Sequence, residues 1–361
     1  MSKIKKERET WIDYAKVIGI ILVLLGHIKL IDPTLQWFIF SFHMPLFFFI
    51  SGYLHKSADS IGSSIKKDVQ RLLLPYVYFY LITYALWLAA FLVNHKNDTE
   101  VIQEGVIKPL LGLLVGVGYE TDISLSVNHP IWFLVGLFVA KSMFTVIEKI
   151  TGGNKLYITL IIIVLTVAVT SIKLAGYDLW FSIDSAVLAL PFLYAGVLTR
   201  SFGTIKKWFG NNSVNLIWVV LMGTITFFLC IYNQRVDINS TNWGNNLLVY
   251  YLEGFTGMLM VFALCFVLDQ YPTKFILFVS ANTMVLLATQ SKLKSVVVSG
   301  FRSVGYRFPE KVDITQALVI TLAIFILSLP VMYIIDKYFP FLAGGTKKIK
   351  LNLQQREKSE L

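Results

Sequence analysis

Residues 11–31 read WIDYAKVIGIILVLLGHIKLI, a run in which apolar side chains dominate. A helix needs about 20 predominantly apolar residues to cross the hydrocarbon core of a bilayer, and this run has that length. Similar runs recur along the chain, and each is expected to be a helix, since open strands cannot satisfy their backbone groups in lipid. The ten predicted spans are 11–31, 35–55, 72–93, 130–149, 156–175, 181–199, 214–233, 247–268, 275–291 and 313–335.

The composition supports the same class of protein. Of the 361 residues, 56% are hydrophobic and 15% are charged, whereas a soluble domain carries about 25% charged residues. So much apolar surface excludes a disordered chain. The two cysteines, Cys230 and Cys265, lie in apolar runs and are too few for a disulfide scaffold. We therefore predict an all-α polytopic membrane protein, with a transmembrane domain over residues 1–340 and a basic cytoplasmic tail over 341–361.

The net charge of +10 at pH 7 is interpreted as a consequence of how the chain is oriented in the membrane. In a soluble protein it would indicate nucleic acid binding, but in a membrane protein Lys and Arg gather on cytoplasmic loops. With both termini in the cytoplasm, the inner side has roughly twice as many basic residues as the outer side. The basic segment 292–312 fits poorly, so either a late span is misplaced or that loop faces a ligand. The first span contains Asp13, Lys16 and His27 and is interpreted as a retained helix, not a cleaved signal peptide.

Ionisable residues within spans are costly and tend to face a cavity or a partner. Lys16 and His27 are three helical turns plus about 20° apart, so they share one face, about 16 Å apart along the axis. Asp13 precedes Lys16 by less than one turn and is close enough to pair with it. Lys16 is expected near the cytoplasmic side and His27 in the outer half. The alternative is that Lys16 snorkels to the interface while His27 hydrogen-bonds to a neighbouring helix.

The second predicted span contains a histidine next to a proline. Pro45 removes a backbone donor and is expected to kink or break the helix just before it, where His43 lies. Carbonyl groups freed at membrane depth require a cavity or a polar neighbour. Ser51 and Gly52 are small and allow another backbone to approach closely. Without His43 and Pro45, the phenylalanines of this span would indicate only a lipid-facing helix.

A basic cluster, Lys66, Lys67 and Arg71, precedes the third span. Such a cluster anchors a helix on anionic lipid headgroups, and the same arginine would suit a phosphate-rich ligand through bidentate hydrogen bonds. Glu253 lies in the eighth span and must find a partner or stay protonated. Trp132 is most simply an interfacial belt residue. Spacings typical of a metal site or a Gly-rich phosphate loop were not found.

Several stretches together carry a resemblance to a known family. They are Trp11–Lys16 (WIDYAK), Leu25–His27 (LGH), Phe42–Leu54 (FHMPLFFFISGYL), Arg71–Tyr76 (RLLLPY), Trp132–Leu134 (WFL) and Pro191–Gly196 (PFLYAG). The chain resembles the acyltransferase-3 family of integral membrane O-acyltransferases, and within it the fucose 4-O-acetylase-like branch. The family's pattern of a basic residue, ten spacers and a histidine falls on Lys16 and His27, although many members have Arg in the place of Lys16.

The chain departs from the family pattern at three points. Some members have two arginines three residues apart before the third span, whereas here Asp68 occupies the first place and only Arg71 remains. Members often end the penultimate span with a histidine, where this chain has Gln290, so a role for that histidine is not carried over. Fused members also have a soluble hydrolase-like domain, which is not found here.

The resemblance implies acyl transfer, in the first place of acetyl, from acetyl-CoA to a sugar hydroxyl. Lys16 and Arg71, with Lys67, would hold the CoA phosphates, and Asp13 would orient or neutralise Lys16. His27 would act as general base toward the sugar hydroxyl or as a transient nucleophile. His43 would be a second base or an oxyanion donor. The sequence does not separate these roles.

The acceptor is expected near the outer face, as a lipid-linked glycan or a growing surface polysaccharide such as a capsule or exopolysaccharide. Ser51, Trp132 and Glu253 are candidates for substrate or structural roles. Expected partners are membrane lipid, the glycan acceptor and other surface-polysaccharide assembly proteins, without nucleic acid or metal, in a bacterial cell membrane. The alternatives are a polysaccharide or lipid transporter, which would use the same buried polar residues as a path, and an inactive scaffold of a glycan-assembly complex.

Overall fold

The computed structural model describes residues 8–57, 60–94, 99–119, 121–203, 205–271 and 273–345. In these ranges the chain is helical, and its extended contacts are isolated bridges such as that between Leu30 and Val312. The elements are α1 (Thr10–Gly26), α2 (Thr34–Tyr53), α3 (Ile61–Asp68), the π-helical turn η1 (Val69–Leu73), α4 (Leu74–Asn94), α5 (Thr99–Val115), η2 (His129–Ile131), α6 (Trp132–Ile150), α7 (Lys155–Leu174), α8 (Ile183–Phe202), α9 (Ile205–Trp208), α10 (Asn212–Asn233), η3 (Ile238–Ser240), α11 (Leu247–Leu268), α12 (Lys274–Ala281), α13 (Thr283–Ser303), α14 (Ile314–Tyr338) and η4 (Pro340–Ala343).

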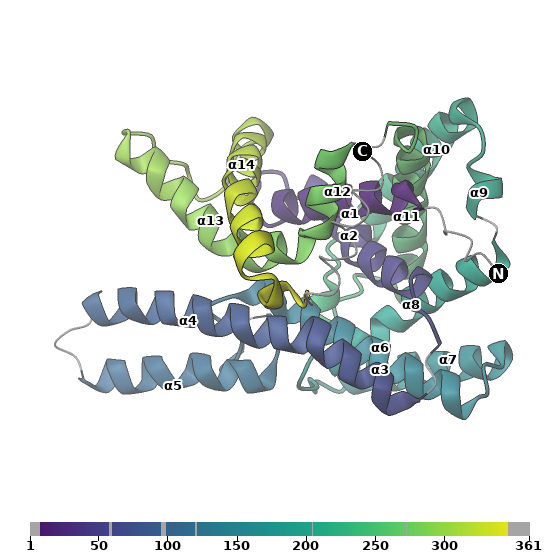
Figure 1. Cartoon of the computed structure of the whole chain (residues 1–361), viewed down its shortest axis with the longest axis horizontal. Coiled ribbons are helices and arrows are strands. Elements are labelled where there is room, and N and C mark those ends of the chain that lie inside the picture. The colour runs from purple at the N-terminus through teal and green to yellow at the C-terminus, as the bar shows by residue number, and fades with distance from the viewer. Residues whose placement is uncertain are drawn as a thin grey trace.

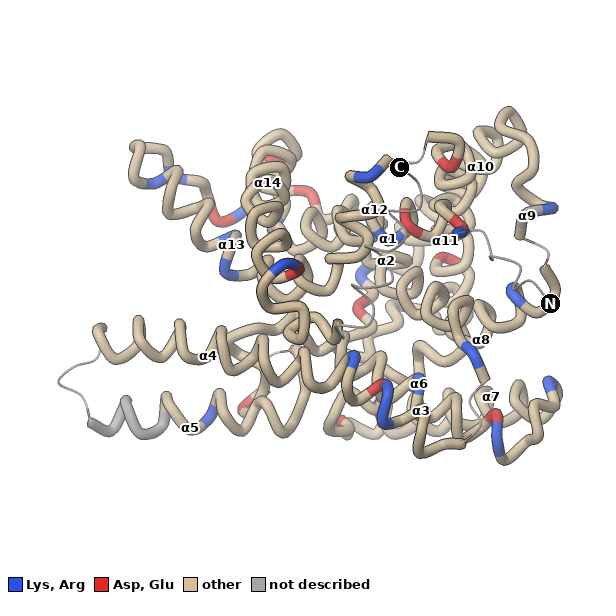
Figure 2. The backbone as a smooth tube through the Cα atoms, viewed as in Figure 1, with Lys and Arg blue, Asp and Glu red and all other residues tan. Residues whose placement is uncertain are grey.

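The prediction of an all-α membrane protein is confirmed. Eight helices of the described chain are long and apolar enough to cross a membrane, or nine if the bent pair α12–α13 counts as one span. Each of the ten predicted spans overlaps a helix, although α1 has only 17 residues. Charged residues are scarce within the long helices, and Figure 2 shows α4 without a charged residue along its whole length.

Helix α5 lies between the predicted spans 72–93 and 130–149, where the sequence analysis placed no span. Figure 1 shows α4 and α5 side by side as an antiparallel pair that extends away from the other helices. Three tyrosines one turn apart on α4 donate hydrogen bonds to carbonyls of α5. Tyr76 bonds to Leu113 at 2.6 Å, Tyr84 to Val106 at 3.1 Å, and Tyr80 to Pro109. This row of hydroxyl groups holds α5 against α4.

The basic segment 292–312 is also partly helical. Helix α13 continues to Ser303, well beyond the predicted end of the ninth span, and its axis turns by 73° from that of α12 at Asn282. Lys292 and Lys294 therefore lie on a helix and not in a loop. The chain after α13 returns to α1, where Val312 exchanges backbone hydrogen bonds with the segment after that helix.

Helices α2 and α8 cross at two glycines, which confirms the close approach predicted at Gly52. A Cβ on Gly52 would overlap the carbonyl oxygen of Leu193, and one on Gly196 would overlap that of Phe49. Small residues at such crossings let two backbones pack in van der Waals contact. The contact fixes α2 against α8.

The break predicted at Pro45 is absent, because α2 is one continuous helix. Proline within a membrane helix is tolerated where neighbouring helices re-satisfy or cover the freed backbone group. Pro45 cannot donate to the carbonyl of Ser41. That carbonyl is covered by α11, where a Cβ built on Gly254 would lie 3.4 Å from it.

Candidate functional site

A pocket of about 790 Å³ lies between α1, α2, α6, the α12–α13 bend and the turn η1. Small-molecule sites have volumes of about 300–1,000 Å³, so the pocket can take a large ligand. Along α1 its lining changes from Lys16 to Val23, about 10 Å further along the helix axis. The pocket therefore has a charged end and an apolar end.

The charged end combines residues from five separate segments. Its cations are Lys16, Lys56, Lys67, Arg71 and Lys141, and its anions are Asp68 and Asp336. The structure thus brings together Lys16, Lys67 and Arg71, which the sequence had singled out for phosphate binding. Ser51 lines the same pocket. A surplus of cations in a partly enclosed site attracts polyanionic ligands.

Arg71 lies on the π-helical turn Val69–Leu73 between α3 and α4. Single π-helical turns are rare and occur frequently at functional sites. Gly344 follows η4 and packs against the backbone of Arg71, since a Cβ built on it would lie 2.9 Å from the Arg71 Cα. Gly344 has φ +68°, which also favours glycine. The chain after α14 therefore covers the turn that carries Arg71 and lines the pocket beside it.

Asp13 pairs with Arg8 and not with Lys16, which corrects the pairing indicated by the sequence. Arg8 Nε and Nη2 donate to the two carboxylate oxygens of Asp13, each at 2.8 Å. These bonds raise the pKa of the Arg8 guanidinium. Ser280 of α12 also donates to Asp13, at 2.5 Å. Lys16 has no hydrogen bond within the described residues, so its ammonium group remains available to a ligand in the pocket.

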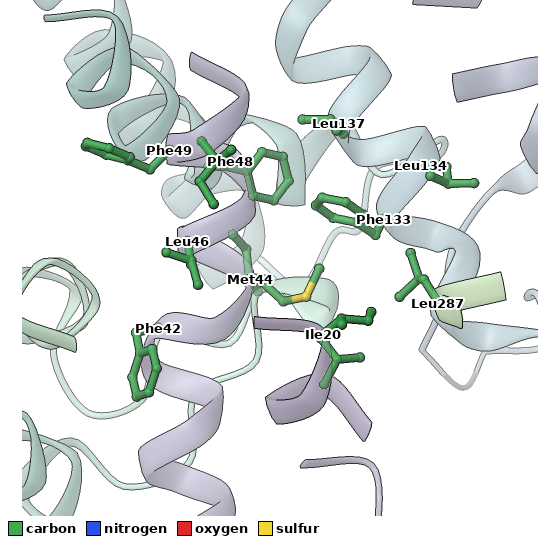
Figure 3. Packing of buried hydrophobic residues seen from close by; sticks show 14 of the residues in the cluster. Ile20, Phe42, Met44, Leu46, Phe48, Phe49, Phe133, Leu134, Leu137 and Leu287 are labelled. Atoms are coloured by element: carbon green, nitrogen blue, oxygen red, sulfur yellow. The ribbon is translucent and has the colours of Figure 1, made fainter. Parts of the chain in front are cut away.

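The apolar end of the pocket is walled by side chains from four helices. Ile20 of α1, Met44 of α2, Phe133 of α6 and Leu287 of α13 line it, and Figure 3 shows them converging on a common space. All four residues are buried. An apolar space suits an uncharged, flexible chain better than a hydrated headgroup.

Two histidines lie just beyond the apolar end. His27 follows α1, and its Nδ1 lies 2.7 Å from the carbonyl oxygen of Val23, a residue that lines the pocket. His43 directly precedes Met44 in α2, and its Nδ1 lies 2.8 Å from the carbonyl oxygen of Ile39. Since a carbonyl only accepts, each Nδ1 carries the hydrogen and each neutral ring keeps its lone pair on Nε2. Both rings are thus set up as bases through Nε2.

The two imidazoles flank one aromatic ring. The ring centre of Phe40 is 6.0 Å from that of His27 and 4.9 Å from that of His43. His43 is buried, whereas His27 is exposed. Lys294 of α13 donates to the carbonyl oxygen of His27 at 2.8 Å. The base nearer the surface is therefore His27, and a cation from the basic segment 292–312 lies beside it.

Trp132 and Glu253, two other candidates from the sequence, both lie in buried positions. Trp132 is buried and packs against Gly118, so it is not a belt residue at a lipid interface as the simplest interpretation had it. Glu253 lies outside the pocket, fully buried on α11, and accepts a hydrogen bond from the Asn233 side chain at 2.9 Å. This contact joins α10 to α11 and gives Glu253 its partner.

The sequence analysis did not predict two polar pairs at the pocket. Both residues of the first pair line the pocket, and one residue of the second does. Lys141 of α6 pairs with Asp68 at 2.5 Å. His55 Nε2 lies 3.1 Å from the Glu148 carboxylate. Both pairs join residues far apart in sequence, so no local spacing indicates them. The residues that the structure describes contain no group of three or more His, Cys, Asp or Glu side chains arranged to hold a metal ion.

Comparisons with known proteins found two similarities. A family model described as an acyltransferase domain matches residues 9–337. A nodulation protein, NolL, of Mesorhizobium japonicum is 28% identical over 244 residues, which is 62% of this chain and 56% of the relative. The chain therefore spans little more than half the length of that relative. No solved structure shows significant similarity to the chain.

Proposed function

Because the chain belongs to the acyltransferase-3 family, we propose that it transfers an acetyl group from acetyl-CoA to a hydroxyl of a glycan. Membership of this family shows that the chain is an acyltransferase. The donor and the acceptor are our proposal. We also propose that the chain belongs to the fucose 4-O-acetylase-like branch and lies in a bacterial cell membrane. One observation carries it: the pocket leads from a cationic end to an apolar end that stops beside two histidines.

The parts of CoA match the two ends of the pocket in chemistry and in the order in which they follow one another. CoA has a polyanionic nucleotide at one end and its thioester at the end of a long flexible arm. Lys16, Lys67 and Arg71 would bind the phosphates, with the Arg71 guanidinium able to grip one of them bidentately. The arm would follow the apolar wall past Ile20 and Met44. The thioester would then lie next to the histidines.

The proposed reaction needs one base and one way to stabilise negative charge. Nε2 of His27 takes the proton of the acceptor hydroxyl as the oxygen attacks the thioester carbonyl. The tetrahedral intermediate collapses, the C–S bond breaks, and the CoA thiolate leaves and is protonated from the imidazolium. His43 would be a second base or, when protonated at Nε2, a donor to the intermediate's oxyanion. A transient acetyl-imidazole on His27 is the other route to the same product.

The acceptor is proposed to approach from the side of the exposed His27. This end lies opposite the cationic end of the pocket along α1, so donor and acceptor would enter from different sides. A lipid-linked glycan or a growing surface polysaccharide, in contact with membrane lipid and with other assembly proteins, suits such an arrangement. The acetyl group would then cross most of the membrane while attached to CoA.

Two measurements test the proposed function. NMR of the cell-surface polysaccharide should show O-acetyl signals with the protein and none after its deletion. Purified protein in lipid nanodiscs should transfer radiolabelled acetyl from acetyl-CoA to that polysaccharide or its precursor. Loss of polysaccharide export with unchanged acetylation would contradict the proposal and support a transporter.

A further inference from the structure

Asp68 and Lys141 form an ion pair within the cationic end of the pocket. The Lys141 Nζ lies 2.5 Å from the Asp68 Oδ1, which joins the last residue of α3 to the middle of α6. Both residues line the pocket, and so does Arg71, one turn after Asp68. The pair therefore lies where the proposed donor would place its phosphates.

The two partners differ in what they leave accessible. The side chain of Asp68 is 4% exposed, whereas that of Lys141 is 23% exposed. An ammonium group has three donors, and among the described residues only Asp68 accepts from this one. The carboxylate is thus covered while the ammonium keeps donors for a ligand in the cavity. Asp68 fixes the direction in which Lys141 points.

A lysine in the middle of an apolar membrane helix is costly and needs a partner or a function. A pair that served only to join α3 to α6 would gain nothing from facing a cavity. Arg71 also lines the pocket and has no hydrogen-bond or ion-pair partner among the described residues. Lys141 and Arg71 therefore present two cations with free donors to one space.

We propose that Lys141 is a phosphate-binding residue and that Asp68 is its positioning residue. Lys141 and Arg71 together bind a phosphate of the donor nucleotide, and Asp68 holds the ammonium group toward it. The inference rests on the proposed CoA donor and assigns to that site a cation from α6, far from Arg71 in sequence. Asp68 acts through Lys141 and does not touch the donor.

Affinities for CoA of single and double variants separate this role from a purely structural one. Lys141→Met should weaken CoA binding by about tenfold or more, since a charged hydrogen bond to phosphate is lost. Asp68→Asn keeps an oxygen that can accept from Lys141 but loses the charge that holds the ammonium group in place, so it should weaken CoA binding by less than Lys141→Met does. The double variant should bind as weakly as Lys141→Met. Titration calorimetry in nanodiscs measures all three.

A structural pair predicts a different pattern. Both single variants would then leave one buried charge unpaired, would weaken CoA binding equally, and would be rescued in the double variant. That result overturns the role of Lys141. Lys173→Ala is the matched control, because Lys173 pairs with Asp178 outside the pocket and its loss should leave CoA affinity unchanged.

Dephospho-CoA shows which phosphate is bound. If Lys141→Met weakens CoA but not dephospho-CoA, Lys141 contacts the 3′-phosphate, and equal weakening of both points to the diphosphate. Either result supports the assignment. If the wild-type protein binds no CoA, the proposed donor is overturned together with this inference. If Lys141→Met binds CoA as tightly as the wild type does, the inference alone is overturned.

Discussion

The carbonyl oxygen of Val23 accepts a hydrogen bond from Nδ1 of His27 at 2.7 Å, and Val23 itself lines the deep end of the pocket. One residue thus belongs both to the wall of the proposed donor site and to the group that orients the proposed base. The bond sets the Nε2 lone pair of His27 away from α1. An acyl group at the end of the pocket would lie about one helical turn from that imidazole.

Replacing His27 by alanine should separate chemistry from donor binding. We expect the kcat for acetyl transfer to fall by about 10²–10⁴-fold, because the base is lost. The CoA affinity should stay within about twofold of wild type, since His27 does not line the pocket. Steady-state kinetics and calorimetry on the same preparation measure both. His27→Ala with full activity would show that this residue is not the base.

Arg71→Lys tests the geometry of phosphate binding at constant charge. Lysine keeps the cation but cannot make the paired hydrogen bonds of a guanidinium. The Kd for CoA should rise by roughly three- to tenfold, while the affinity for pantetheine, which lacks the nucleotide, should not change. Arg302→Lys on α13, outside the pocket, is the matched control. Equal effects of both substitutions would contradict a direct contact of Arg71 with the donor.

From their spacing, the sequence predicted that Lys16 and His27 share one helix face. The structure has Lys16 on α1 and in the pocket, whereas His27 directly follows α1 and lies just beyond the end of the pocket. The partner of Asp13 did not follow from the sequence, since the side chain reaches back to Arg8, before the helix begins. Lys141 was also missed, because its contact with Asp68 joins helices far apart in the chain.

Gly52→Ala should destabilise the fold by disturbing the crossing of α2 and α8. The added methyl group would overlap the carbonyl oxygen of Leu193, so the helices would have to separate. Overpacking of this kind costs about 1–3 kcal/mol of unfolding free energy. Gly62→Ala on α3 is the control, since a Cβ there meets nothing within 4 Å. A Tm for Gly52→Ala at or above that of Gly62→Ala would argue against the close crossing.

Tyr80→Phe should loosen the pair formed by α4 and α5. Tyr80 is fully buried, and its hydroxyl donates to the carbonyl oxygen of Pro109. Removing the donor should cost about 1 kcal/mol of unfolding free energy. Hydrogen exchange should report faster opening of α5. Tyr78→Phe, whose hydroxyl has no partner among the described residues, should leave exchange unchanged.

Helix α5 shows why part of the fold could not be predicted from the sequence. Its sequence contains Pro109, which argues against a helix interior, and its first turns are polar. Its position depends on tyrosines of α4, one helical turn apart, that donate to its carbonyls. The regular spacing of Tyr76, Tyr80 and Tyr84 was the available signal, but it does not reveal which segment accepts the hydrogen bonds.

A structure of the protein determined with CoA bound tests the central claim most directly. The account predicts that the nucleotide phosphates contact Lys16 and Arg71, that the arm passes Ile20 and Met44, and that the sulfur ends beside His27. A nucleotide bound near His27, or a CoA molecule outside the pocket, would contradict the proposed path from the cationic end to the histidines.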